Sequence, residues 1–350
     1  MEYQKLTAGF VCATLGLLLL LPAPPGHAAE DLFESEVAVS DQTPGVRIEA
    51  FRTGLSQTIV RVTGDQAALS GEPARALLED PARLVQQYRY FTEPSTSPPA
   101  LKLWVRFDGD AIRRSLQTQG LSYWGGERPD TLVWLAVEDR GRRYIVSADD
   151  SSDVHRQVEL AARQRGVPML FPLMDLQDQS RVRFADLWGG FFGKVMTASE
   201  RYSPSAVLIG RLNRSPSGGW SSRWFLEVVG RTNEWSDSHR QLRELARQGV
   251  EDVADILATR FAVSGSGAGG RTVDITVDGI ETLAAYARIS KYLASLSSVS
   301  NVEVSELTPG GVQYALQVSG SMQDMMRTVS IGTVLEPEPG GLPGSFRLRQ

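Results

Sequence analysis

The first third of the chain combines apolar residues at helical spacing with a segment of strict alternation. Four apolar residues lie three or four positions apart and predict an amphipathic helix that begins near Pro44 and ends at Gly64: Phe51, Leu55, Ile59 and Val62. Residues 101–107 alternate apolar and polar side chains, which predicts a half-buried strand. The pattern therefore mixes helix and strand within one short segment.

Weaker signals complete this segment. Residues 32–39 are typical of a short strand. A second helix is predicted from Pro81 with Asp80 as its cap, and Asp110 is expected to cap a third, shorter helix. Because a glycine- and proline-rich turn follows, we predict a small N-terminal α+β domain over residues 30–126.

Residues 131–137 form a nearly continuous apolar run, which is typical of a strand covered on both faces. Strand and helix signals then alternate. Further strands are predicted at residues 144–146, 167–173, 206–210 and 223–229, and helices at residues 154–165, 184–199 and 236–261. This order predicts a central domain, residues 127–263, with a layered α/β sheet and an antiparallel hairpin at one side.

The last part of the chain follows a glycine- and serine-rich linker at residues 264–271. Its predicted elements are a strand at 273–277, a helix at 283–296, a hairpin of residues 302–304 and 312–318, a helix begun by the capping box of Ser321 and Asp324, and a strand at 346–348. Their β-α-β-β-α-β order predicts a ferredoxin-like domain over residues 272–350. The fold class is thus α/β and α+β.

The first 29 residues resemble an export signal. Lys5 precedes an uncharged run over residues 6–21, four residues rich in proline follow, and small residues precede a cleavage point after Ala28 or Ala29. We expect a cleaved signal peptide and a periplasmic protein; the alternative is an inner-membrane anchor formed by an uncleaved segment. Cleavage would also remove Cys12, the only cysteine, and with it any thiol chemistry.

Composition excludes few classes of function. The net charge of −5 argues against nucleic-acid binding, because no basic surplus exists to neutralise phosphates. Hydrophobic residues make up 42% of the chain, which is enough for a core without disulfides. The sequence holds no Gly-x-Ser-x-Gly elbow, no phosphate-binding loop and no paired-histidine zinc motif. We therefore predict no cofactor and no metal.

Five short motifs carry a resemblance to a known group. They occur in order at residues 59–64, 131–139, 165–168, 172–176 and 199–202. With them the chain resembles an uncharacterised family of proteobacterial exported proteins, a domain of unknown function, over residues 32–263. The resemblance implies a Gram-negative envelope setting and no active site. More weakly, residues 206–210 and the hairpin of Trp220 and Trp224 are similar to α/β domains of the curli-secretion and Tol-accessory type, which implies binding of other envelope components.

Few residues suggest catalytic chemistry. His155 and His239 are the only histidines after the signal, and a group of aspartates precedes the first of them: Asp149, Asp150 and Asp153. A metal site would use such ligands. The same residues are typical caps and turn formers at the start of a helix, which is the interpretation we favour.

Asp175 and Asp178 follow a predicted buried strand, where α/β sheets often place ligand sites. With Arg181 and Arg183 nearby they could form a polar site, and as an acid/base pair they would make the chain a hydrolase of envelope polymers. The competing interpretation is an acidic loop that caps the next helix through Asp186.

Trp220, Arg223 and Trp224 are the best binding candidates, because aromatic rings and guanidinium groups can stack on sugars or anchor a protein. The alternative is that the tryptophans pack the hairpin onto its helices. From these observations we expect a non-catalytic envelope accessory or scaffold protein that binds an envelope protein, a cell-wall component or an outer-membrane component. The alternatives are the hydrolase that uses Asp175 and Asp178 and a glycan-binding module that uses Trp220 and Trp224.

Overall fold

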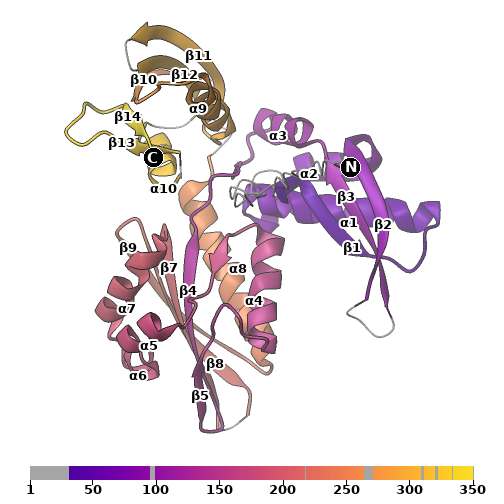
Figure 1. Ribbon diagram of the computed structural model, residues 1–350. Coiled ribbons are helices and arrows are strands. Elements are labelled where there is room, and N and C mark those ends of the chain that lie inside the picture. Colours follow the sequence, from indigo (N-terminus) through magenta and orange to yellow (C-terminus); the bar gives the residue numbers. More distant parts are fainter. Residues whose placement is uncertain are drawn as a thin grey trace, which may run out of the picture.

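The computed structural model describes residues 31–94, 99–216, 218–263, 271–308, 311–319, 322–332 and 334–349. Within these residues the chain is a mixed α/β protein with three separate sheets, which confirms the predicted fold class (Figure 1). The strands of each sheet lie within one of the three predicted segments. None of the helices in the described part is long and apolar enough to cross a membrane.

The N-terminal sheet is antiparallel, in the order β1 (Glu34–Ala38), β3 (Ala100–Phe107), β2 (Val85–Glu93). Helix α1 (Pro44–Thr63) covers one face and buries the predicted apolar residues, among them Leu55 and Ile59. It ends where predicted because Gly64 adopts a left-handed conformation, with φ of 72°. Two shorter helices, α2 (Glu72–Glu79) and α3 (Gly109–Thr118), complete the domain.

Two predictions for this domain were wrong. Pro81 begins only a 3-10 turn, Pro81–Leu84, and the expected helix is strand β2. The spacing of Leu84, Val85 and Tyr88 resembles a helix, but pairing with β3 over the whole length of β2 decides the conformation. Helix α3 is capped by Asp108, which accepts the Ala111 amide, and not by Asp110.

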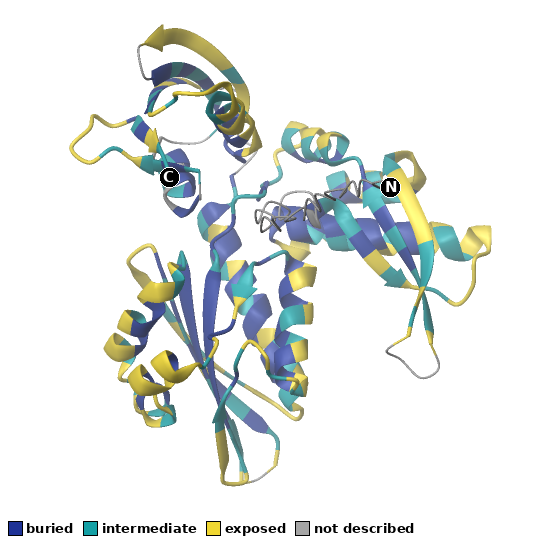
Figure 2. Ribbon diagram, viewed as in Figure 1, coloured by how far each residue is buried: buried dark blue, intermediate teal, exposed yellow. Residues whose placement is uncertain are grey.

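The central sheet has the order β5 (Arg142–Ile145), β4 (Thr131–Asp139), β7 (Ala206–Arg214), β8 (Trp220–Val228), β9 (Arg231–His239). Strands β4 and β7 are parallel, and the β7–β8–β9 part is antiparallel. Helices α4 (Asp153–Arg165) and α8 (Leu242–Phe261) cover one face, and α5 (Leu176–Arg181), α6 (Phe184–Gly189) and α7 (Phe192–Ser199) lie on the other (Figure 1). Strands β4 and β7 are accordingly buried for most of their length (Figure 2).

Three predicted elements of this domain differ from those in the structure. The strand expected at residues 167–173 is only the two-residue strand β6 (Met169–Leu170), which pairs with the start of β4. The single helix at 184–199 is two helices, because Gly190 takes a φ of 81° and ends α6. The helix expected at 236–261 begins only at Leu242, because the preceding residues pair with β8 as strand β9.

The C-terminal sheet has the order β11 (Val299–Thr308), β12 (Gly311–Val318), β10 (Arg271–Asp278), β14 (Ser345–Leu348), β13 (Leu335–Pro337). With α9 (Leu283–Ser295) and α10 (Met322–Ile331) it has the predicted β-α-β-β-α-β order, plus the additional edge strand β13. The last strand, β14, runs parallel to β10, whereas the last and first strands of a ferredoxin-like sheet are antiparallel. The ferredoxin-like prediction is therefore wrong in this pairing, because β13 intervenes and reverses the chain. The predicted signal, the stretch 264–270 of the linker and Ser321 of the capping box lie outside the described residues.

Candidate functional site

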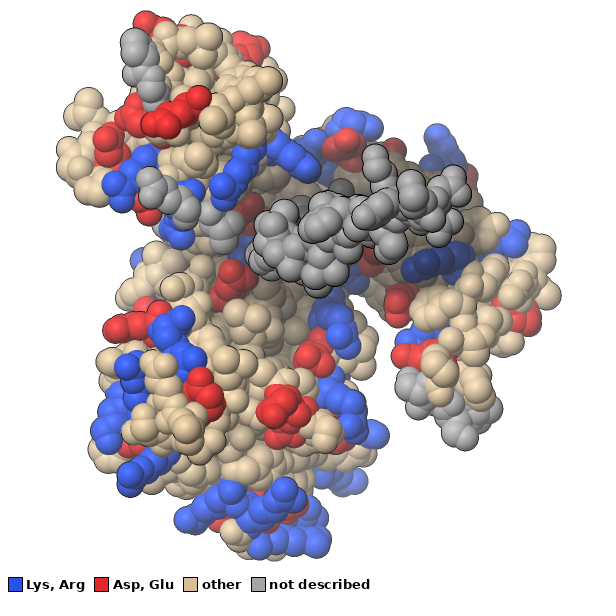
Figure 3. Space-filling model, viewed as in Figure 1, with Lys and Arg blue, Asp and Glu red and all other residues tan. Residues whose placement is uncertain are grey.

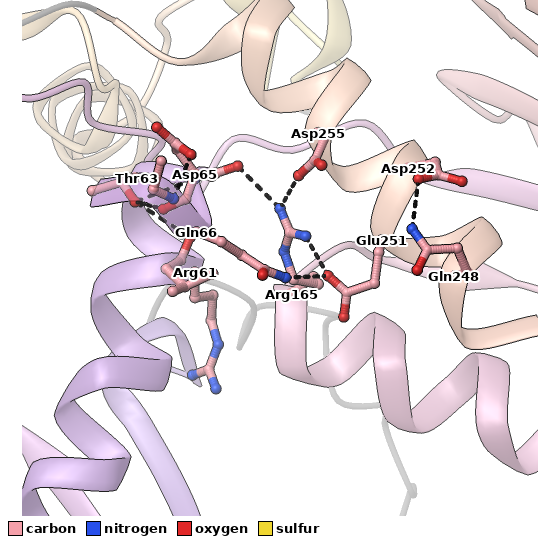
Figure 4. Close-up of polar contacts among 12 residues, drawn as sticks. Arg61, Thr63, Asp65, Gln66, Arg165, Gln248, Glu251, Asp252 and Asp255 are labelled. Atoms are coloured by element: carbon pink, nitrogen blue, oxygen red, sulfur yellow. Dashed lines mark hydrogen bonds and ion pairs between the residues drawn. The ribbon is translucent and has the colours of Figure 1, made fainter. Parts of the chain in front are cut away.

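A cluster of buried arginines joins the N-terminal and central domains. Arg165 lies at the end of α4, where its Nη2 donates to the Gly64 carbonyl at 3.0 Å and to Asp255 at 2.6 Å. Its Nη1 pairs with Glu251 (Figure 4). Burial opposes the charged form of Arg165, but the hydrogen bonds to Asp255 and Glu251 prevail and raise its pKa. One side chain thus connects α1, α4 and α8.

Arg128 is the second member of this cluster and is 6% exposed. All its hydrogen bonds go to carbonyls at two helix ends and in its own loop: those of Arg61 at 2.7 Å, Arg165 at 2.8 Å, Gly166 at 3.1 Å, and Trp124 and Gly125 at 2.9 Å. Helix C-termini carry partial negative charge, so they suit a cation. Burial first, and then the charges of Arg61 and Arg165, lower the pKa of Arg128 to about 9.

Arg61 completes the cluster by donating to the Gln164 carbonyl at 3.1 Å and to the Leu32 and Glu34 carbonyls at 3.1 and 2.6 Å. We call Arg61, Arg128 and Arg165 the interdomain arginine cluster. Two of the motifs that carried the resemblance, residues 59–64 and 165–168, therefore meet here. Their hydrogen bonds and ion pairs stabilise the contact between the domains.

Asp175 and Asp178 do meet, but with a different arginine from those expected. Arg201 Nη1 donates to Asp175 at 2.8 Å and to Asp178 at 2.9 Å, while Tyr202 donates its hydroxyl to Asp178 at 2.5 Å. The hydrogen bonds of Arg201 hold the pKa of Asp175 well below its usual range, so this carboxylate stays ionised and is a poor general acid. Asp178 is fully buried.

The arrangement at Asp175 is that of a helix start. Asp175 accepts the Asp178 amide at 2.9 Å and caps α5, and Asp186 accepts the Arg183 amide at 2.9 Å at the start of α6. These bonds correspond to the capping interpretation of the acidic loop. Two further motifs of the resemblance, residues 172–176 and 199–202, are joined by the bonds of Arg201 to Asp175 and by the Leu173 amide, which donates to the Tyr202 hydroxyl at 2.9 Å.

The aspartates before His155 also serve the start of a helix. Asp150 accepts the Ser152 amide, and Ser152 caps α4 by accepting the His155 amide at 3.3 Å. The His155 ring packs against Phe171 with ring centroids 4.5 Å apart. In the described part of the chain, no three His, Cys, Asp or Glu side chains are placed to hold a metal ion.

The two tryptophans of the hairpin face the core. Trp224 is 1% exposed and contacts Gly210 and Gly249, where even a Cβ atom would lie 2.3 and 2.2 Å from its ring. Trp220 is 7% exposed. Trp235 stacks on Trp224 with centroids 6.3 Å apart. Because these rings face α8, they offer no open face on which a sugar could stack.

Arg223 lies on the opposite face of the same strand and lines a groove of about 550 Å³. Helices α6 and α7 contact β4 and β7, and this groove lies beside them over β8 and β9. We call it the sheet groove. Its lining residues are Trp188, Arg211, Asn213, Ser221, Ser222, Arg223, Ser236, Asp237 and Ser238.

Two cations lie side by side in the sheet groove. Arg211 and Arg223 are direct partners across β7 and β8, and neither forms an ion pair with any described residue. Arg211 donates to the Trp188 carbonyl at 2.9 Å. Burial first and the charge of Arg223 second lower the pKa of Arg211, and Glu234 offsets this only in part.

The acidic member of the groove does not neutralise these arginines. Asp237 pairs with Ser222 and not with Arg223 across β8 and β9, so its side chain lies on the opposite face of the sheet, where burial first and the neighbouring Asp252 second raise its pKa. The lining residues that share a face of the sheet with the two arginines are Asn213, Ser221, Ser236 and Ser238, which supply one amide and three hydroxyls. Adjacent cations with hydroxyl donors around them suit an anionic ligand that brings several oxygen acceptors.

Another basic surface differs from this groove. Exposed arginines gather at the tip of the β4–β5 hairpin, which forms the lowest part of Figure 3. There Arg143 pairs with Glu138 at 3.3 Å, and Arg214 pairs with Asp139 at 3.5 Å. The cations of this tip are therefore partly compensated by carboxylates of the same chain, whereas those of the sheet groove are not.

The comparison with known protein families bears on the N-terminal domain. A family model described as a domain of unknown function, DUF8605, matches residues 27–125, which cover the N-terminal sheet and end before β4. The resemblance predicted a longer span, residues 32–263. No curated protein matches the chain. The match supports an uncharacterised domain, and it transfers no site to these residues.

The sequence pointed to one residue of the sheet groove, Arg223, and missed its partners. Arg211 and Trp188 lie 12 and 35 positions earlier in the chain, and only the hairpin register and the break at Gly190 bring them together. A register prediction for this hairpin, which the sequence already indicated, would have found Arg211 opposite Arg223. No comparable signal exists for Trp188.

Proposed function

We propose that this protein is a non-catalytic accessory or scaffold protein of the cell envelope that binds an anionic envelope component in the sheet groove. The observation that supports it is the adjacent pair Arg211 and Arg223, two cations that form no ion pair with a described residue and lie in a hollow lined by hydroxyl groups. Placing like charges together destabilises a protein unless a partner offsets them, so the arrangement favours an anion as the missing partner.

The setting of this proposal rests on the sequence. The signal-like first 29 residues favour export to the periplasm, and the five motifs favour a proteobacterial exported family. The similarity of residues 206–210 and of the following hairpin to curli-secretion and Tol-accessory domains favours work by binding. Phosphate and carboxylate groups of lipopolysaccharide or peptidoglycan carry the charge that the two arginines need.

A photo-reactive residue placed at Ser238 tests this proposal in intact cells. Ser238 is exposed and lines the groove. The matched control is Thr232, exposed on the same strand and, six residues away, on the same face of the sheet, about 20 Å distant. We expect irradiation to join an envelope component to the chain from position 238 and not from position 232. Repeated recovery of uncrosslinked chain from both positions would count against the proposal.

A further inference from the structure

A second groove lies between the N-terminal domain and helix α4. It has a volume of about 680 Å³, within the range of ligand sites. One wall is strand β1 with the neighbouring Trp104, and the other is the second half of α4 with the chain that follows it. We call it the β1 groove. Strand β1 is the edge of its sheet on the side of α4 (Figure 1).

The main chain of β1 presents unpaired groups along this edge. The Val39 amide donates to the Leu101 carbonyl of the neighbouring strand at 2.9 Å, and in an antiparallel ladder every second residue pairs in this way. Glu34, Glu36 and Ala38 therefore point their amides and carbonyls away from β3. All three line the groove.

One outward group shows that this edge is ready to accept hydrogen bonds. The Glu34 carbonyl accepts a hydrogen bond from the Arg61 guanidinium at 2.6 Å. No described residue bonds to the outward groups of Glu36 and Ala38. Two amides and two carbonyls at this spacing match the backbone of one extended strand.

The wall opposite β1 carries two side chains that could contact the side chains of a bound strand. Leu160 is 44% exposed, and Arg163 is exposed without an ion pair among the described residues. They lie three positions apart on α4, hence on one face, and both line the groove. A strand repeats a side-chain direction every two residues, at a spacing of about 7 Å that fits neighbouring positions on a helix.

We propose that an extended peptide segment of a partner protein adds to the edge of β1 in the β1 groove. Its backbone pairs with Glu36 and Ala38. Toward α4 it presents an apolar side chain against Leu160 and, two residues away, an acidic side chain against Arg163. This site is distinct from the sheet groove and does not depend on the function proposed for that groove.

Selection from a displayed library of random ten-residue peptides against the purified full chain tests the proposal. We expect enrichment of sequences with an apolar and an acidic residue two positions apart. Binding should slow hydrogen exchange of the Glu36 and Ala38 amides. It should leave Tyr90 and Thr92 unchanged, because by the same alternation these two point outward on the other edge strand, β2.

Ala38→Pro is the matched substitution, because it removes one outward amide and leaves the ladder with β3 intact. Thr92→Pro makes the same change on the opposite edge. We expect Ala38→Pro to weaken binding of the selected peptides at least about tenfold and Thr92→Pro to leave their affinity unchanged. Peptides that bind equally to both variants, or no enriched sequence at all, would overturn the proposal.

Leu160→Glu provides a second test if the proline variant fails to fold. The new carboxylate should repel the acidic peptide and weaken binding by a similar factor, whereas Leu283→Glu at an exposed position of α9 should not. Self-association of the chain that Ala38→Pro abolishes would instead assign this edge to a second copy, and it would contradict a peptide partner.

Discussion

The interdomain arginine cluster and the sheet groove both contain adjacent arginines, but the electrostatic surroundings of these arginines differ. In the cluster, Arg128 and Arg165 are buried and donate hydrogen bonds to carbonyls at helix ends or to Glu251 and Asp255. In the groove, Arg211 and Arg223 face each other without an ion pair among the described residues. The difference separates arginines that hold the fold together from arginines whose charges no carboxylate pairs with in the described part of the chain.

The largest effect is expected from Arg128→Ala. The substitution leaves buried carbonyls at the ends of α1 and α4 without a donor, and each unsatisfied group costs roughly 1–3 kcal/mol. We expect the free energy of unfolding to fall by about 3–5 kcal/mol, because at least two buried carbonyls lose their donor and the large side chain leaves a cavity. Urea denaturation followed by circular dichroism measures it.

Arg114→Ala is the control, because Arg114 is an exposed arginine on α3 that makes no ion pair with a described residue. Its effect should stay within about 0.5 kcal/mol. A loss below about 1 kcal/mol for Arg128→Ala would mean that the cluster does not hold the two domains together.

Glu127 sharpens the comparison because it adjoins Arg128 in the sequence and forms no ion pair with a described residue. Burial first and the charge of Asp130 second raise its pKa from 4.5 to about 7. Between these values the folded chain keeps a proton that the unfolded chain has released. The free energy of unfolding should therefore fall by about 3 kcal/mol as pH rises from about 4.5 to 7, and then stay level.

Glu127→Gln should remove this dependence, because the amide cannot ionise. Urea denaturation of both proteins at several pH values between 4.5 and 8 shows the result. The two stability curves should converge at low pH and separate as pH rises, with the variant more stable. Curves that stay parallel throughout would show that Glu127 is ionised in the folded chain.

The smallest effect on stability is expected from Arg223→Met in the sheet groove. Arg223 is exposed and in no ion pair among the described residues, and its loss relieves the repulsion on Arg211. The free energy of unfolding should change by less than about 0.5 kcal/mol in either direction. A loss above about 1 kcal/mol in urea denaturation would place Arg223 with the structural arginines instead.

The elements with the clearest local pattern were predictable. Strand β4 follows from the apolar run at 131–137, and α1 follows from its spaced apolar residues and Gly64. Strands β2 and β9 were missed because their residues carry helix-like spacing or small polar side chains. Their conformation comes from pairing with β3 and β8, which lies outside the local sequence.

The candidate site was less predictable than the fold. Arg223 was singled out with Trp220 and Trp224, but alternation along the strand puts the arginine in a groove and the tryptophans in the core. Arg128 lies in a segment that the sequence marked only as a boundary. Its role depends on helix ends more than 35 residues away in both directions along the chain, which no local pattern reports.

The central claim is that the sheet groove binds an anionic envelope component, and titration of Arg223→Met tests it most directly. Lipopolysaccharide vesicles and soluble peptidoglycan fragments are the probes, with Arg114→Met as the control for charge. We predict that at least one probe binds the unaltered chain and the control alike, and binds Arg223→Met at least about tenfold more weakly. Equal affinity of all three proteins for every probe, or no binding to any of them, would contradict the claim.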